Sequence, residues 1–203
     1  MKVNPSPRRS QAERTAATRA TLLAAARKQF STNAFVDVST QSIAEAAGVT
    51  RGALYHQFAD KTELFAAVHE QVEAELVEKI ADGIAGAGPV DPLAAMRTGA
   101  RLFLDLCSAP DVQRIVLLDA PSVLGWDRWR EVGLKYGLGV IEALLGQAVA
   151  GGVIPDQPVR PTAHILLGAL DEAALYVSRA ADPVQARADM YAVCDRIISG
   201  IAD

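Results

Sequence analysis

Between Glu45 and Asp60 the chain has no carboxylate, although its net charge is -4. The guanidinium of Arg51 can donate two hydrogen bonds to a guanine edge or can contact a phosphate. Further donors to phosphate oxygens follow in the same stretch at Thr50, Tyr55 and His56. These residue types at this spacing predict binding to a polyanion rather than catalysis.

The residues around this stretch fit the same chemistry. Gly52 and Ala53 are small, so a helix that carries them can lie deep in the major groove of DNA. Lys61 stands at the start of the next expected helix, where free backbone N–H groups also favour a phosphate. Gln41 precedes the stretch and could reach a phosphate or a base edge.

The charge of the chain is unevenly distributed. Residues 1–62 hold nine basic and four acidic side chains, a net +5, so the other 141 residues must carry -9. A basic front and an acidic back suggest two tasks in one chain. A solvated helix face and a mobile arm would also explain the basic part, so charge alone does not decide between these interpretations.

The composition favours an all-α fold, because alanine, leucine and glutamate recur and runs of β-branched residues are rare. A helix is expected over 11–31. A second helix, capped by Ser39 or Thr40, should stop at Gly48, and a third should follow from Thr50. Gly48 is expected to adopt a left-handed conformation, as the turn of a helix-turn-helix needs.

A longer fourth helix should begin after Asp60 and carry an apolar stripe formed by Leu64, Val68, Val72, Leu76 and Ile80. Five more helices are expected, over 91–108, 110–119, 126–150, 162–180 and 183–201. The chain therefore divides into a flexible basic arm (1–10), a three-helix DNA-binding head (11–62) and a larger helical bundle (63–203), with nine helices in all.

Several functional classes find no support in the sequence. It contains no nucleophile elbow, phosphate loop or metal-ligand spacing, so we expect no enzyme, cofactor or metal site. Cys107 and Cys194 lie far apart and are expected to be reduced thiols, although a redox pair stays open. No apolar run reaches about 18 residues and no signal peptide is visible, which predicts a cytoplasmic protein without a membrane segment.

The stretch IAEAAGVTRGALYHQFADKTELF, residues 43–65, resembles the DNA-binding signature of the TetR family of bacterial transcriptional regulators. The resemblance spans about residues 18–66, and the nine-helix count also fits. It implies a homodimer that binds a near-palindromic DNA operator, usually as a repressor, and dissociates when a small molecule enters the larger domain. The DNA contacts that it implies are Ser39, Gln41, Thr50, Arg51, Tyr55, His56 and Lys61. Many relatives have a basic residue in place of Gln41.

Aromatic and sulfur side chains gather on three segments of the larger domain, at Phe103, Cys107, Trp126, Trp129 and Tyr136. They could be ordinary core residues, or they could line an apolar cavity for a largely apolar effector. Trp126 and Trp129 could stack on a flat or cationic ligand. Asp105, Asp119 and Glu172 could balance a cation or could lie on the surface.

The last two expected helices carry small and apolar residues at helical spacing, namely Leu166, Ala169, Ala173, Tyr176, Met190, Cys194, Ile197 and Ile201. They could pack within one chain, or they could form half of the four-helix dimer interface that the resemblance implies. We favour the interface, because a short head needs a partner to reach two half-sites one DNA turn apart. The alternative function is a DNA-binding regulator without a small-molecule effector, controlled by a partner protein or acting as an activator.

Overall fold

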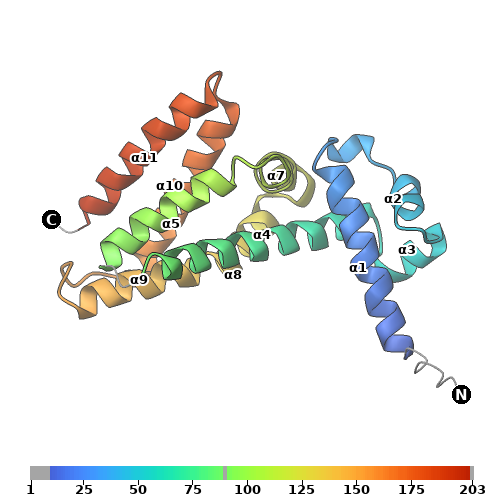
Figure 1. Ribbon diagram of the computed structural model, residues 1–203, viewed down its shortest axis with the longest axis horizontal. Helices are drawn as coiled ribbons and strands as arrows, with labels where there is room; N and C mark the ends of the chain where they lie inside the picture. The colour runs from blue at the N-terminus through green and yellow to red at the C-terminus, as the bar shows by residue number, and fades with distance from the viewer. Residues whose placement is uncertain (1–9, 89–90, 202–203) are drawn as a thin grey trace, which may run out of the picture. The chain divides into compact units, whose positions relative to one another are not determined.

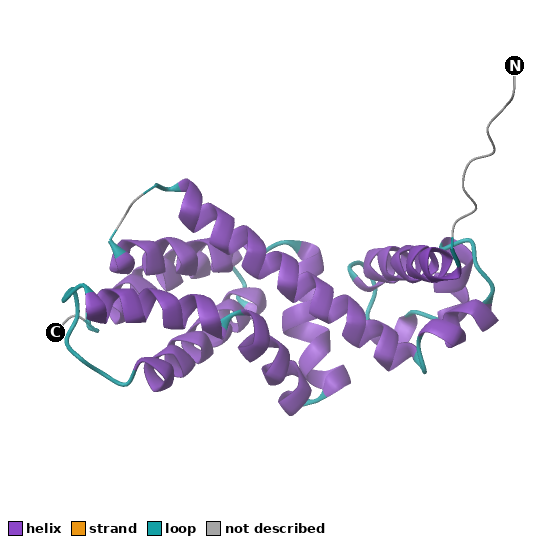
Figure 2. Ribbon diagram, turned by 90° about the horizontal axis from the view of Figure 1, so that it is seen from below, coloured by secondary structure: helices purple, strands orange, loops and turns teal. Residues whose placement is uncertain are grey.

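The computed structural model describes residues 10–88 and 91–201, and these residues form helices and connecting turns without a strand (Figures 1 and 2). The all-α class is therefore confirmed. Contacts divide the chain into two compact units, Met1–Val68 and His69–Asp203, and the division falls inside one long helix. Apart from Ser10, the predicted basic arm lies outside the described residues.

The N-terminal unit packs its helices around three phenylalanines. Its elements are α1 (Gln11–Phe30), the 3-10 turn η1 (Phe35–Asp37), α2 (Thr40–Ala46), α3 (Arg51–Gln57) and the start of α4 (Lys61–Gly86). The Phe65 ring meets those of Phe30 and Phe35 edge-on, with centroids 5.1 and 5.3 Å apart. Such edge-to-face pairs add to the free energy gained by burying the rings, and they fix η1 against α1 and α4.

Three helices of this unit begin at side chains that the sequence predicted as caps. In each, the side-chain oxygen accepts a hydrogen bond from the backbone N–H three residues later, which satisfies a donor that the helix leaves free. The caps are Ser39 for α2, Thr50 for α3 and Asp60 for α4, with N···O distances of 3.0, 3.1 and 2.8 Å. For α2, the structure decides between the two predicted candidates in favour of Ser39.

Gly48 makes the turn between α2 and α3. Its φ of +67° confirms the left-handed conformation that was expected. The N–H of Gly48 bonds to the carbonyl of Glu45 at 3.0 Å, and the N–H of Val49 reaches back to Ala44, also at 3.0 Å. This is the Schellman arrangement, which ends α2 and reverses the chain so that α3 can cross it.

The C-terminal unit is a helical bundle. It contains the rest of α4 and then α5 (Pro92–Leu106), α6 (Pro110–Val112), the π-helical η2 (Gln113–Asp119), α7 (Ala120–Leu124), α8 (Trp126–Tyr136), α9 (Leu138–Ala150), α10 (Val159–Arg179) and α11 (Pro183–Ser199). The predicted stripe of α4 is confirmed, because Leu64, Val68, Val72, Leu76 and Ile80 are all buried.

The helix predicted over 126–150 is in fact two helices, so the described residues hold more helices than the nine expected. α8 and α9 meet at Gly137 with a bend of 46°. Gly133, Gly137 and Gly139 weaken the helix here, because glycine is a poor helix former. Among the described residues no single helix is long and apolar enough to span a membrane, and only this bent pair, taken together, meets both criteria.

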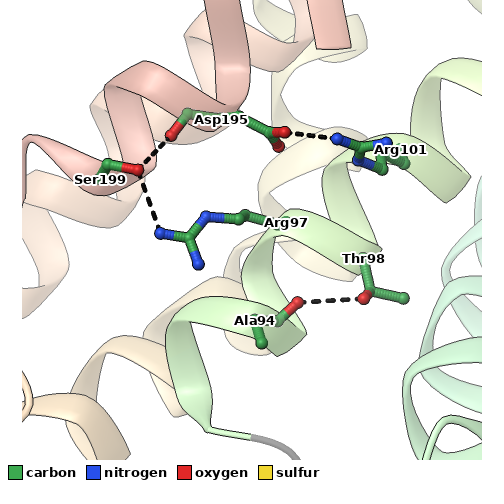
Figure 3. A network of polar contacts seen from close by, with 6 residues as sticks. All are labelled: Ala94, Arg97, Thr98, Arg101, Asp195 and Ser199. Carbon is green, nitrogen blue, oxygen red and sulfur yellow. Dashed lines mark hydrogen bonds and ion pairs between the residues drawn. The ribbon is translucent and has the colours of Figure 1, made fainter. Parts of the chain in front are cut away.

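A polar seam joins α5 to α11 (Figure 3). Arg97 donates to the hydroxyl of Ser199 at 3.0 Å, and that hydroxyl donates to the carbonyl of Asp195 at 2.7 Å. One turn further along α5, Arg101 pairs with the Asp195 carboxylate. The seam fixes α11 against α5 from the solvent side, while the apolar faces of both helices turn inward.

Candidate nucleic-acid interface and internal cavity

Exposed polar side chains of α2 and α3 form a connected network. The Tyr55 hydroxyl lies 3.1 Å from that of Thr40 and accepts a hydrogen bond from the Arg51 guanidinium at 3.3 Å. The Arg51 guanidinium also lies 5.4 Å from the centre of the Tyr55 ring. The hydrogen bonds from Thr40 and then Arg51 lower the pKa of Tyr55. The network holds Arg51 at the exposed first turn of α3.

The remaining predicted contacts on these helices are accessible. Gly52 and His56 are exposed on α3, and a Cβ added at Gly52 would meet only the Thr50 hydroxyl, 3.8 Å away. No bulky side chain projects from α3 at Gly52, so this part of the helix can approach the floor of a DNA groove closely. Gln41 is exposed on α2 and donates to Glu45 at 2.6 Å, so it would exchange that bond for one to DNA.

Lys61 has an internal role that the sequence did not suggest. Its ammonium donates to the carbonyls of Phe35 and Val38 at 2.8 and 2.9 Å, and it lies 4.1 Å from the centre of the Phe35 ring. An ammonium has three donors, so one is left for the phosphate contact predicted for Lys61. The side chain ties η1 to the start of α4.

Two arginines of α1 lie near α3. Arg19 donates to the carbonyl of Gln57 at 3.3 Å and stacks 4.3 Å over the Phe58 ring. It therefore caps the C-terminal end of α3, where a positive charge is favourable. Arg14 and His56 line one surface hollow of about 320 Å³ between α1 and α3. Arg14 therefore places a second basic side chain of α1 beside the exposed face of α3.

The C-terminal unit contains a partly open cavity of about 90 Å³. Its walls come from α4, α5 and α8 to α11, and most of the side chains that line it are apolar. Several are glycines, and a Cβ added at Gly99 would lie 3.1 Å from Ile84. The helices therefore approach closely around the cavity. The polar side chains in the lining are Glu73, Asp171 and Cys194.

Glu73 and His69 are the buried polar residues of α4, with exposed fractions of 8% and 0%. Nε2 of His69 lies 3.7 Å from Oε1 of Glu73, and neither nitrogen of His69 has a hydrogen-bond partner among the described residues. Burial lowers the pKa of His69 to about 4, so its ring is neutral at pH 7. Burial, helped by the charge of Asp171, raises the pKa of Glu73 to about 7.

The second carboxyl group of the cavity has a partner. Asp171 on α10 accepts a hydrogen bond of 2.6 Å from Arg130 on α8, which also donates to the carbonyl of His164 at 3.4 Å. Burial raises the pKa of Asp171 to about 6 although Arg130 opposes the shift. Cys107 is buried too, and burial followed by the charges of Glu73 and Asp171 raises the pKa of its thiol.

The structure brings one of the five predicted ligand residues, Phe103, to the described wall of the cavity. Cys107 caps the C-terminus of α5, outside the lining. Buried Trp129 donates to the carbonyl of Val116 at 3.0 Å, and Trp126 is 64% exposed. The Tyr136 hydroxyl donates to Glu70 at 2.9 Å. Asp105, Asp119 and Glu172 also lie outside the described lining.

Sequence reasoning missed the two cavity carboxylates. A signal for Glu73 was present, because residues 69, 73, 76 and 80 follow helical spacing on the buried side of α4. His69 and Glu73 interrupt this otherwise apolar stripe, and such an interruption indicates a polar site. Asp171 had no such signal, because its neighbour Glu172 is equally acidic and is exposed.

The residues predicted for a dimer interface point in different directions. Leu166, Ala173 and Cys194 are buried within the chain's own unit, at 8%, 5% and 6% exposure, whereas Tyr176 is 52% exposed. Those that line the cavity are Leu166, Ala169, Cys194 and Ile197, the last of which is 43% exposed. Met190 and Ile201 are half-buried. Beside this set, Ile165 leaves 73% of its surface exposed.

Comparison with known proteins covers both units. Residues 22–68 match the family described as bacterial regulatory proteins of the tetR family, and residues 93–201 match the tetracyclin repressor-like C-terminal domain. The crystal structure of a TetR-family transcriptional regulator from Pectobacterium atrosepticum is 34% identical in sequence and superposes with a TM-score of 0.82. The match covers 96% of this chain and 98% of the chain in that crystal structure.

Two further similarities are more limited, one in length and the other in sequence identity. The HTH-type transcriptional regulator AcrR of Shigella flexneri is 40% identical over 80 residues, which is 39% of this chain and only 37% of that relative. The regulator FadR of Bacillus subtilis, solved with stearoyl-CoA, shares the fold at 16% identity, with a TM-score of 0.68 and coverage of 91% and 97%.

The structure has a helix-turn-helix in α2 and α3, and the two matched regions assign both units to the same family. The resemblance seen in residues 43–65 is thereby confirmed for the whole chain. The chain belongs to the TetR family of DNA-binding bacterial transcriptional regulators.

Proposed function

We propose that this regulator is a homodimeric repressor that binds a near-palindromic operator through α3 and dissociates when a small, largely apolar effector enters the cavity. The observation that carries the proposal is that α4 contributes both to the helix-turn-helix unit and to the cavity wall. Residues 61–68 of α4 belong to the first unit, and Glu73, Val77 and Ile80 of the same helix line the cavity.

The DNA half of the proposal rests on the network of Thr40, Arg51 and Tyr55. Arg51 supplies a forked donor at the start of α3, and the first residues of a recognition helix are those that meet base edges. The hydroxyls of Thr40 and Tyr55 supply donors for phosphates on either side. In this proposal Ser39, Gln41, Gly52 and His56 complete the contact surface, and Lys61 adds its one remaining donor.

The effector half rests on the cavity. Its lining is mostly apolar, and FadR of Bacillus subtilis, which shares the fold, was solved with a ligand that has a long apolar chain. A volume of about 90 Å³ is below the range of about 300–1,000 Å³ typical of ligand pockets. A larger effector must therefore displace the walls, α4 among them, and a ligand that prefers the displaced state shifts the equilibrium.

Selection of bound sequences from a random DNA duplex pool tests the DNA-binding half. A single palindromic motif is expected, and Arg51→Ala should weaken binding to it by about tenfold or more, a loss of about 1–3 kcal/mol. Lys79→Ala removes an exposed positive charge from α4 in the other unit and is the matched control. Binding without any motif, lost in moderate salt, would contradict the proposal.

The dimer is tested on the exposed face of α10. Ile165 and Tyr176 are eleven residues apart, three helical turns, so they share a face that the chain leaves open. Ile165→Glu combined with Tyr176→Glu should give monomers in analytical ultracentrifugation. Val36→Glu, at a residue 79% exposed in the head, is the control and should leave the mass unchanged. If the double variant stays dimeric, the dimer interface does not use this face of α10.

A further inference from the structure

We propose that the effector carries one protonated amine on an otherwise apolar body, and that Glu73 binds this amine inside the cavity. The inference rests on the proposed release of the regulator by a ligand in this cavity, and it names the chemistry of that ligand. Glu73 is a buried acidic side chain on the largely apolar wall of this cavity.

Glu73 lines the cavity with 8% of its surface exposed, and none of its oxygens has a hydrogen-bond donor among the described residues. On the same helix, Nε2 of His69 lies 3.7 Å from Oε1 of Glu73, which is too far for a hydrogen bond, and the neutral His69 ring does not balance a negative charge. A largely buried carboxyl group without a donor is costly, because it loses most of its bonds to water. A ligand ammonium would supply both the donors and the opposite charge.

The other groups around Glu73 leave its charge unbalanced. Asp171 faces it from α10, and the charge of Asp171 is already paired with Arg130 of α8 at 2.6 Å. Cys107, at the end of α5, is held as a neutral thiol. With both carboxyl groups ionised, the cluster has one negative charge in excess, which matches a monocation. A carboxylate ligand would instead add a third negative charge in a place without a free partner.

The size of the cavity limits the probes that can test the idea. A cavity this small calls for a small probe, such as a cyclohexane ring that carries one further carbon and one polar group and no other functional group. Cyclohexylmethylamine, cyclohexylmethanol and cyclohexanecarboxylate differ in charge and little in shape. Isothermal titration of the full-length protein with each compound at pH 8 compares a cation, a neutral molecule and an anion.

The amine should bind about tenfold or more tightly than the alcohol, and the carboxylate should bind most weakly. Glu73→Gln should reduce amine affinity by about ten- to a hundredfold and should change alcohol affinity little, because a hydrogen bond to a charged group is lost. Glu78→Gln makes the same change at an exposed position of the same helix and should leave all three affinities unaltered.

The pH dependence gives a second signature. Because the pKa of Glu73 is about 7, amine affinity should rise by about tenfold between pH 6 and pH 8 in the unaltered protein. Glu73→Gln should show a smaller rise, to which only Asp171, with a pKa of about 6, still contributes. Circular dichroism of both variants checks that they are folded before the titrations are compared.

Equal affinities for amine and alcohol, an amine preference that survives Glu73→Gln, or no binding of any probe would each overturn the inference. Binding of the ligand-free protein to its selected operator is measured on the same preparations. A protein that binds its operator without preferring the amine loses this inference and keeps the DNA-binding proposal. A protein that binds no operator loses the proposed function, whatever the probes do.

Discussion

Replacing Glu73 by glutamine should make the C-terminal unit more stable at high pH. The pKa of Glu73 is about 7 in the folded protein, against an ordinary value of 4.5, and the first cause is burial. The folded state therefore holds this proton more tightly than the unfolded chain does. The resulting loss of stability is absent below pH 4.5, grows as the pH rises, and is complete above pH 7.

The size of the effect follows from the shift in pKa. A shift of this size corresponds to about 3 kcal/mol, of which about 2–3 kcal/mol develops between pH 5 and pH 8. The glutamine side chain of the variant cannot ionise, so the free energy of unfolding of the variant lacks this contribution to its pH dependence. His69 acts in the opposite sense, because its lowered pKa removes stability as the pH falls from 6.5 toward about 4, but it is present in both proteins.

Urea unfolding monitored by tryptophan fluorescence measures the difference. Trp126 and Trp129 are the two tryptophans of the chain and both belong to α8, so the signal reports on the C-terminal unit. Subtracting the free energy of unfolding of the native protein from that of the variant should give a value that rises by about 2–3 kcal/mol from pH 5 to pH 8. Glu78→Gln should give a constant difference. A constant difference for Glu73→Gln as well would refute the claim that this carboxyl group is buried without a partner.

Three further outcomes are expected. Gly48→Ala should destabilise the head by about 1 kcal/mol, because a residue with a Cβ strains at φ +67°, and thermal unfolding of the head followed by circular dichroism measures it. Lys61→Met removes a charged donor from two carbonyls and should cost about 2–3 kcal/mol, seen as faster amide exchange in residues 35–38; unchanged exchange would contradict the contact. Trp129→Phe loses the bond to the Val116 carbonyl and should cost about 1–2 kcal/mol in urea unfolding, and no loss would mean that this carbonyl finds another partner.

The head could be predicted from the sequence because its signals are local. A cap such as Thr50 acts on an N–H three residues away, and Gly48 decides one pair of backbone angles. The hydrophobic stripe of α4 likewise follows from helical spacing alone. Each of these features depends on a few neighbours along the chain, so no knowledge of the tertiary fold was needed.

The cavity could not be predicted in the same way, because it depends on how six helices are rotated about their axes. Trp126 and Trp129 are three residues apart, yet one is exposed and the other is buried. The break at Gly137 was also missed, although three glycines stood in the predicted helix. Residue type marked the aromatic side chains as candidates. Helical spacing alone could have placed Glu73 on the buried side of α4, but only the packing of α4 against its neighbours shows that Glu73 lines a cavity.

The burial of both cysteines has a practical consequence for following this regulator at work. Cys107 and Cys194 are buried in the folded chain, and burial raises the pKa of each thiol, so neither presents a reactive thiolate at neutral pH. The native chain therefore behaves toward maleimide reagents almost as a cysteine-free protein. A cysteine introduced at exposed Val36 would take up a single spin label or fluorophore. In the proposed dimer, the distance between the two labelled heads could then be measured with and without the proposed amine ligand, without first replacing the native cysteines.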